Sequence, residues 1–182
     1  MNIYPTSLQY STILTQQFPM ITAYYAFALC AGNTFGGIII SPLNRLFNDF
    51  GLRPLFHISA GVQLVAYGIA VSTVPNWSTA RPTDQSAYFK PDLMWVCLVA
   101  FLLGVADSAN SASSAVWCSR ILPGRASHTY STARFYRGIA ASMIFFFSPI
   151  LTMRTHAAIL ISVTFISALS FELAVKKIEK RD

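Results

Sequence analysis

The fold class is decided by the stretch Leu93-Met-Trp-Val-Cys-Leu-Val-Ala-Phe-Leu-Leu-Gly-Val-Ala-Asp107-Ser-Ala-Asn110-Ser-Ala-Ser-Ser-Ala-Val-Trp-Cys118. At ~1.5 Å per residue, roughly 20 apolar residues cross the hydrocarbon core of a bilayer. This stretch is longer, and its one charged residue is Asp107. An acid at that depth costs several kcal/mol, so it usually faces the interior of a helix bundle or a water-filled cavity. The stretch therefore predicts a helical membrane protein with a polar site inside it.

The composition of the whole chain also favours a membrane protein. It is 54% hydrophobic and only 11% charged, whereas a soluble domain carries about 25% charged residues. The net charge of +6 is not arranged as a basic stripe with interleaved aromatics, so we expect no nucleic-acid partner. The cysteines Cys30, Cys97 and Cys118 lie inside apolar runs and indicate neither a disulfide framework nor a metal cluster. No catalytic grouping of nucleophile, base or paired carboxylates is found in the sequence, so we predict a non-enzymatic protein that needs no cofactor.

Apolar runs and polar breaks divide the chain into segments. We predict a stub or outer loop at the N-terminus, a helical membrane domain, and a short basic tail: 1–19, 20–175 and 176–182. The expected spans within the membrane domain are 20–43, 55–74, 93–118, 129–152 and 157–175. The predicted fold class is therefore all-α integral membrane, with five transmembrane helices or five of a set of six.

Lysine and arginine predict the orientation in the membrane. They gather after the first, third and fifth spans, at Arg45, Arg53, Arg120, Arg125 and the tail from Lys176 onward. The positive-inside rule then predicts an N-terminus outside or in a lumen and a cytosolic C-terminus, in a plasma membrane or an endomembrane alike. The glycosylation sequon at Asn76 falls on the outer side in this topology.

Polar and small residues of the third span follow helical spacing. Asp107 and Asn110 share one helical face, and Gly104 and Ser108 form a small-xxx-small pair beside it. One interpretation is a packed interface joined by hydrogen bonds; the other is an ion or proton site. In the first span, Gly32 and Gly36 have the spacing of a GxxxG contact and predict close helix packing.

Two arginines at the start of the fourth span are candidate partners for Asp107. Arg134 and Arg137 lie near a predicted cytosolic helix end, where both could extend to the interface. At ~1.5 Å per residue, Arg137 lies about 6 Å in depth from Asp107. We therefore hypothesise an intramembrane pair between Asp107 and either Arg137 or Arg134.

Several stretches resemble a known family of membrane proteins. The turn at residues 44–54, with Asp49, Gly51 and Arg53, looks like the degenerate loop motif Asp-Arg-x-Gly-Arg-Arg-Pro of the major facilitator superfamily. The stretches 31–37 and 84–88, and above all 101–110, sharpen the likeness. Together they resemble the Unc-93-like (uncoordinated-93-like) family, in its metazoan major-facilitator-domain branch.

The resemblance implies the C-terminal half of a major facilitator fold. The five spans would correspond to family helices eight to twelve, and the glycine-x-x-aspartate signature of helix ten falls on Gly104 and Asp107. Asn33 stands where relatives tend to carry an acid, and Arg137 replaces a neutral position. With the first six helices absent, we expect a fragment, a truncated product, or a subunit that pairs with a missing half or a second copy.

Two classes of function follow from this resemblance. Characterised members act as accessory subunits of potassium channels or as trafficking partners of membrane receptors, so the resemblance implies a regulatory membrane protein. The alternative is a solute or proton-coupled transporter in which Asp107 takes part in coupling. Apart from such a protein partner, we expect the chain to contact the lipid bilayer.

Overall fold

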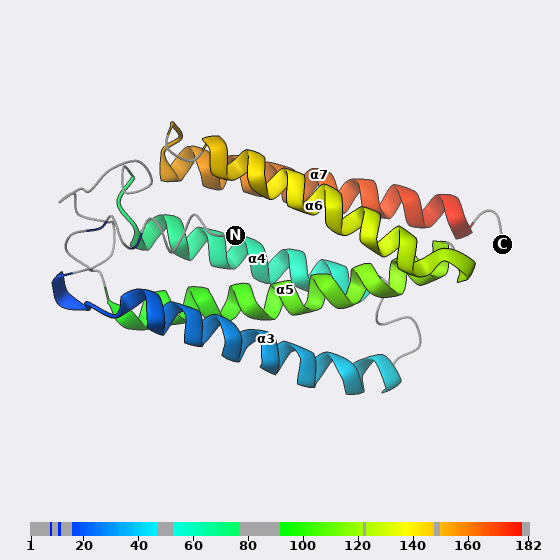
Figure 1. Ribbon diagram of the computed structural model, residues 1–182, viewed down its shortest axis with the longest axis horizontal. Coiled ribbons are helices and arrows are strands. Elements are labelled where there is room, and N and C mark those ends of the chain that lie inside the picture. The colour runs from blue at the N-terminus through cyan, green and yellow to red at the C-terminus, as the bar shows by residue number, and fades with distance from the viewer. Residues whose placement is uncertain are drawn as a thin grey trace.

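The computed structural model describes residues 8, 11, 16–46, 53–76, 92–121, 123–147 and 150–179. Within these ranges the chain forms long helices that lie side by side (Figure 1). The elements are α3 (Ile21–Leu46), α4 (Arg53–Thr73), α5 (Leu93–Ile121), the single 3-10 turn η1 (Pro123–Arg125), α6 (Ala126–Phe147) and α7 (Met153–Glu179). The all-α fold class expected from the sequence is confirmed.

Helix α5 lies at the centre of the arrangement. It packs against α3, α4 and α6, while α7 packs against α4. Figure 1 shows the helices running side by side with alternating direction, so that the start of α4, the end of α5, the start of α6 and the end of α7 lie at one end of the molecule. The basic residues Arg53, Arg120, Arg125 and Lys176 therefore share that end.

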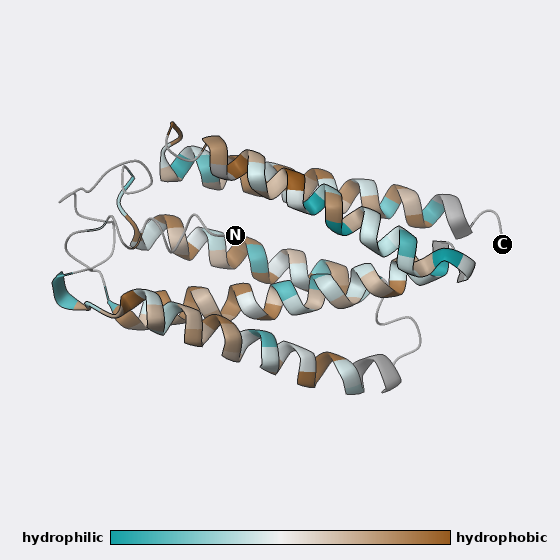
Figure 2. Cartoon of the chain, viewed as in Figure 1, coloured by the Kyte–Doolittle hydropathy of each residue, from teal (hydrophilic) through white to brown (hydrophobic). Residues whose placement is uncertain are grey.

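Four of these helices are long and apolar enough to cross a membrane: α3, α4, α5 and α7. Helix α6 is not among them, because its first turns contain serine, threonine, histidine and two arginines (Figure 2). The fourth span was expected at 129–152, but α6 begins at Ala126 and ends at Phe147. The chain is a membrane protein in which one long helix is more polar than the rest.

Large apolar side chains cover the outside of the molecule. Phe27 on α3 is 78% exposed and Leu173 on α7 is 69% exposed. Soluble monomers rarely expose contiguous apolar surface on this scale, whereas a bilayer solvates it. The apolar core is confined to the contacts around α5, where Val96, Val99 and Leu103 are buried. The described structure is thus apolar outside as well as inside.

Glycine sets the distance between α3 and α5. A methyl group added at Gly32 would lie 2.9 Å from the carbonyl carbon of Phe101, and one added at Gly104 would lie 2.8 Å from the backbone nitrogen of Asn33. Gly36 faces Ser108 at the same interface, where an added methyl group would lie 3.0 Å from the serine Cβ. The two backbones are in direct contact here, so a larger residue forces the helices apart.

We predict that Gly104→Ala and Gly32→Ala each lower the thermal unfolding temperature of the detergent-purified protein. The physical reason is overpacking against backbone atoms that cannot yield, which typically costs about 1–3 kcal/mol. Gly68→Ala on α4 is the matched control, because an added methyl group there meets open space. Equal unfolding temperatures for Gly104→Ala and Gly68→Ala would contradict the close-contact explanation.

Candidate functional site

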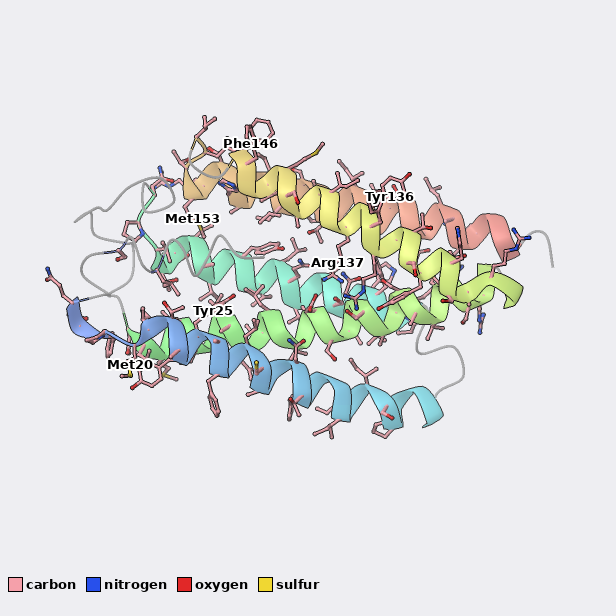
Figure 3. The ribbon with its side chains drawn as sticks, viewed as in Figure 1. Met20, Tyr25, Tyr136, Arg137, Phe146 and Met153 are labelled. Atoms are coloured by element: carbon pink, nitrogen blue, oxygen red, sulfur yellow. The ribbon has the colours of Figure 1, made fainter. Side chains whose placement is uncertain are left out.

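An ion pair joins α5 to α6 in the middle of the bundle. Arg137 of α6 donates a hydrogen bond from Nη2 to Oδ1 of Asp107 on α5. The two side chains are 47% and 40% exposed, so the pair borders an open space and is not sealed inside the protein. Figure 3 shows Arg137 pointing from α6 toward α5, while Tyr136 and Phe146 point away. Opposite charges on facing helices compensate each other where water is scarce.

Arg134, the other candidate partner, makes different contacts in the structure. Its Nε and Nη2 donate to the hydroxyl oxygen of Tyr130 at 3.0 and 2.8 Å, one helical turn earlier. Its guanidinium carbon also lies 5.2 Å from the centre of the Tyr130 ring, within cation–π range. Arg134 is thus held along its own helix, and the structure gives Arg137 the contact with Asp107.

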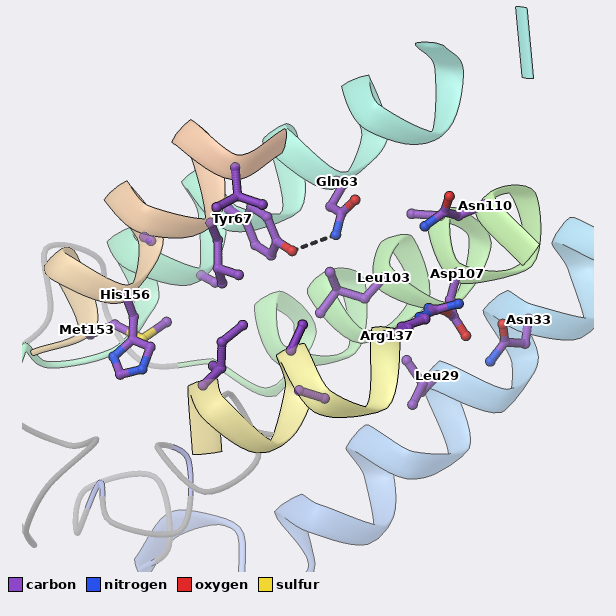
Figure 4. Close-up of a pocket in the computed structure, with 18 residues that line it drawn as sticks. Leu29, Asn33, Gln63, Tyr67, Leu103, Asp107, Asn110, Arg137, Met153 and His156 are labelled. Carbon is purple, nitrogen blue, oxygen red and sulfur yellow. Dashed lines mark hydrogen bonds and ion pairs between the residues drawn. The ribbon is translucent and has the colours of Figure 1, made fainter. Parts of the chain in front are cut away.

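The Asp107–Arg137 pair lines a cavity of about 510 Å³ between the helices (Figure 4). Half of its lining residues are alanine, leucine or isoleucine, and they come from all five long helices, α3 to α7. The other polar side chains on the wall are Asn33, Gln63, Tyr67, Asn110 and His156. Gln63 donates a hydrogen bond to the Tyr67 hydroxyl oxygen within α4. The cavity has the size and the mainly apolar lining of a small-molecule site.

The side chains around the cavity limit its chemistry. Asp107 is paired with a cation that it contacts directly, and Asn110 is an uncharged neighbour. Among the residues that the structure describes, no group of three or more histidine, cysteine or acidic side chains could hold a metal ion. The arrangement is suited to joining helices and to binding a mainly apolar molecule.

Asn76, the predicted glycosylation site, contacts the start of α7. Its backbone oxygen accepts a hydrogen bond from the nitrogen of Met153 at 2.9 Å, and its side-chain Oδ1 accepts one from the nitrogen of Arg154 at 3.1 Å. These nitrogens have no acceptor within the helix. Asn76 therefore caps α7 from the segment that follows α4. Of the predicted loop motif, Arg53 begins α4, whereas Asp49 and Gly51 lie outside the described residues.

A second polar contact was missed in the sequence. Glu172 of α7 accepts a hydrogen bond from, or pairs with, Nε2 of His57 on α4 at 2.7 Å. The stacked rings of Phe56 and Phe171, with centroids 4.2 Å apart, lie next to it. In the sequence, Glu172 lies four residues before Lys176, a spacing that favours an ion pair within one helix. Helical spacing cannot reveal the contact with His57, because the two residues are 115 positions apart.

Comparison with known proteins now gives the family. Residues 1–172 match the family model described as "Ion channel regulatory protein UNC-93". The chain belongs to the UNC-93 family. The match covers nearly the whole chain and supports a regulatory role in the membrane, because the description of the UNC-93 family names regulation and no catalysis. No solved structure gives a significant match to the chain.

We predict that the effects of removing Asp107 and Arg137 on stability are strongly coupled. Asp107→Ala leaves an unpartnered guanidinium inside the membrane and should lower the stability, because an uncompensated charge there is costly. Adding Arg137→Ala should recover much of this loss, since both charges are then gone. The measurement is a double-mutant cycle on unfolding temperature and on yield in detergent. Arg134→Ala is the control and should show little coupling, because Arg134 bonds to Tyr130. A larger coupling with Arg134 would contradict this pairing.

We also predict that Asn76→Ala destabilises α7 by about 1 kcal/mol, as the loss of a helix cap does. Asn76→Asp retains the accepting oxygen and should keep the stability. Ser78→Ala, which removes the sequon and leaves Asn76 in place, is the control for any effect of glycosylation. Proteolysis near the start of α7 and the unfolding temperature are the measurements. If Ser78→Ala lowers stability as much as Asn76→Ala does, the glycan and not the cap is responsible.

Proposed function

We propose that this chain is a non-enzymatic accessory subunit that regulates an ion channel in the membrane. The observation that carries the proposal is the surface of α6. Every side chain from Ser131 to Ala140 is exposed, although α6 is the least apolar of the long helices in the described structure. A helix of this kind is poorly suited to contact with lipid over its whole circumference. Its outer face is therefore suited to another transmembrane protein.

The composition of that face supports a helix–helix contact. We define the α6 outer face by the residues that helical spacing places on the side opposite Arg137: Ser131, Phe135, Gly138, Ile139, Ser142 and Phe146. Gly138 and Ser142 give small-xxx-small spacing, and a methyl group added at Gly138 would meet open space. Small residues let helix backbones approach within membranes, where packing and hydrogen bonds drive association. The flanking aromatic rings add contact area.

The contact between Asp107 and Arg137 favours a regulatory role over transport. A coupling acid must exchange its proton or ion during each cycle, whereas Asp107 directly contacts Arg137. That contact supports a structural role for the acid. One observation favours the alternative of a solute or proton-coupled transporter, namely that Asp107 lines an open cavity.

The class of partner is proposed from the resemblance to characterised family members. That resemblance favours a potassium channel first and, second, a membrane receptor whose trafficking the chain assists. A second copy of the chain and a further six-helix half are the other candidates for the α6 outer face. Basic residues gathered at one end of the helices support a cytosolic location for that end.

The test of this proposal is photo-crosslinking from the α6 outer face in cells that express a potassium-channel subunit. A benzophenone amino acid replaces Phe135, which is 66% exposed. The matched control replaces Phe165 of α7, which is 57% exposed and lies on the described span of highest mean hydropathy. We expect channel adducts from position 135 and few from position 165. Equal labelling from both positions, or only self-adducts from position 135, would rule out this face as the channel contact.

A flux measurement in proteoliposomes tests the alternative. We expect Asp107→Asn to change no solute or proton flux relative to the unaltered protein. Flux that the unaltered protein supports and Asp107→Asn abolishes would establish transport and contradict a purely accessory role. Arg134→Gln is the control for a general effect of charge loss in the bundle.

A further inference from the structure

The middle of helices α5 and α6 contains one positive charge more than the Asp107–Arg137 pair compensates. Asp107 is the only acidic residue in either helix, whereas α6 carries two arginines, Arg134 and Arg137. Asp107 is paired with Arg137, and no ion pair of the described residues includes Arg134. An uncompensated charge inside a membrane is costly. Arg134 is therefore a cation for which the described structure provides no acidic partner.

Arg134 lies at a depth where water and lipid headgroups are distant. Asp107 is the midpoint of α5 (Leu93–Ile121), a helix long and apolar enough to span the membrane. Its contact with Arg137 places that part of α6 at the same level. Arg134 precedes Arg137 by three residues, or ~4.5 Å along the helix, while half of a hydrocarbon core is about 15 Å. The backbone of Arg134 therefore lies inside the hydrocarbon region.

Tyr130 holds the guanidinium of Arg134 against the surface of α6. The tyrosine hydroxyl oxygen accepts hydrogen bonds from Nε and Nη2 of Arg134 at 3.0 and 2.8 Å, and the guanidinium carbon lies 5.2 Å from the ring centre. At ~1.5 Å per residue, Tyr130 is about 10 Å from the level of Arg137, which is still within the half-thickness of about 15 Å. The phenol hydroxyl is uncharged, so these bonds orient the guanidinium without neutralising it.

The surroundings of Arg134 on α6 leave room for a partner helix. Helical spacing of about 100° per residue places Arg134 between Arg137 and the α6 outer face. Arg134 is itself exposed, and a methyl group added at Gly138, one turn further along, would meet open space. A small residue lets a second backbone come close, which brings even a short acidic side chain within reach of the guanidinium. Of the guanidinium nitrogens, Nη1 has no described partner.

From this geometry we infer that Arg134 binds the carboxylate of an aspartate or glutamate in a transmembrane helix of the partner protein. The two oxygens of a carboxylate match the fork of a guanidinium and neutralise it in one contact. A lipid phosphate offers the same sign of charge, but it lies at the membrane surface, whereas Tyr130 holds the guanidinium below that surface. This inference rests on the proposed function and adds the chemistry of the partner: the helix that meets α6 contains an acid close to the bilayer centre.

The experiment measures the binding of a synthetic transmembrane peptide to the full chain in phosphatidylcholine vesicles, by energy transfer between labels on the two. The peptide consists of leucine and alanine, with a single aspartate placed at the level of Arg134. Peptides with asparagine or lysine in place of the aspartate are the comparisons. We expect the aspartate peptide to bind at least about tenfold more tightly than the asparagine peptide. Equal binding of these two peptides would overturn the inference.

Variants at position 134 separate charge recognition from folding. Arg134→Ala should remove the preference for aspartate, whereas Arg125→Ala, which removes an exposed arginine before the start of α6, should retain it. Arg134→Glu should reverse the preference, so that the lysine peptide binds most tightly. Because such a reversal requires a folded bundle, it cannot result from misfolding. An aspartate preference that survives Arg134→Ala would contradict the inference.

A second vesicle composition distinguishes a protein carboxylate from a lipid phosphate. We expect the aspartate preference to persist when phosphatidylglycerol replaces part of the phosphatidylcholine. Its loss would show that headgroup phosphate binds Arg134 and would refute a carboxylate partner. The synthetic helix also separates this inference from the proposed function. Failure of the aspartate preference refutes the role of Arg134 alone, whereas failure of crosslinking from position 135 refutes the channel contact.

Discussion

The contact between Asp107 and Arg137 determines how α6 sits against the rest of the bundle. Helix α6 has α5 as its main neighbour, and most of its described residues are exposed. An unpaired charge at either position would be expensive inside a membrane, so the two helices are favoured only in the register that joins these residues. That register brings Ala140, Ala141 and Ile144 onto the cavity and turns Phe135 and Ile139 outward. One polar contact thus positions both the cavity wall and the α6 outer face.

The α3–α5 interface supplies the rigidity that this ion pair requires. Gly32 and Gly104 bring two backbones into contact, and Ser59 of α4 donates a buried hydrogen bond to the carbonyl oxygen of Ala106 at 2.8 Å. Ala106 directly precedes Asp107, so α5 is held on two sides at the level of the acid. A side chain fixed by such close packing loses little further entropy when it forms an ion pair. The backbone that carries Asp107 is therefore held in place independently of Arg137.

Most of the fold could be predicted from the sequence, because apolar length and polar breaks are local properties. The helices lie close to the expected spans. Helix α6 ends five residues before its expected span does, and its serine, threonine and arginine residues make it less apolar than the other long helices described. Depth counting allowed two partners for Asp107, and the structure joins it to Arg137. The partner of Glu172 could not be predicted from the sequence, since its contact with His57 depends on how α4 and α7 pack. The cap that Asn76 provides for α7 is of the same non-local kind.

The two ends of the cavity differ in how completely their polar groups are satisfied. At one end Asp107 and Arg137 neutralise each other, and Gln63 bonds to Tyr67. At the other end the ring nitrogens of His156 have no partner within the described residues. The described polar contacts that join helices therefore lie toward the ion-pair end of the cavity, whereas Met153 and Ala157 give the other end an apolar wall.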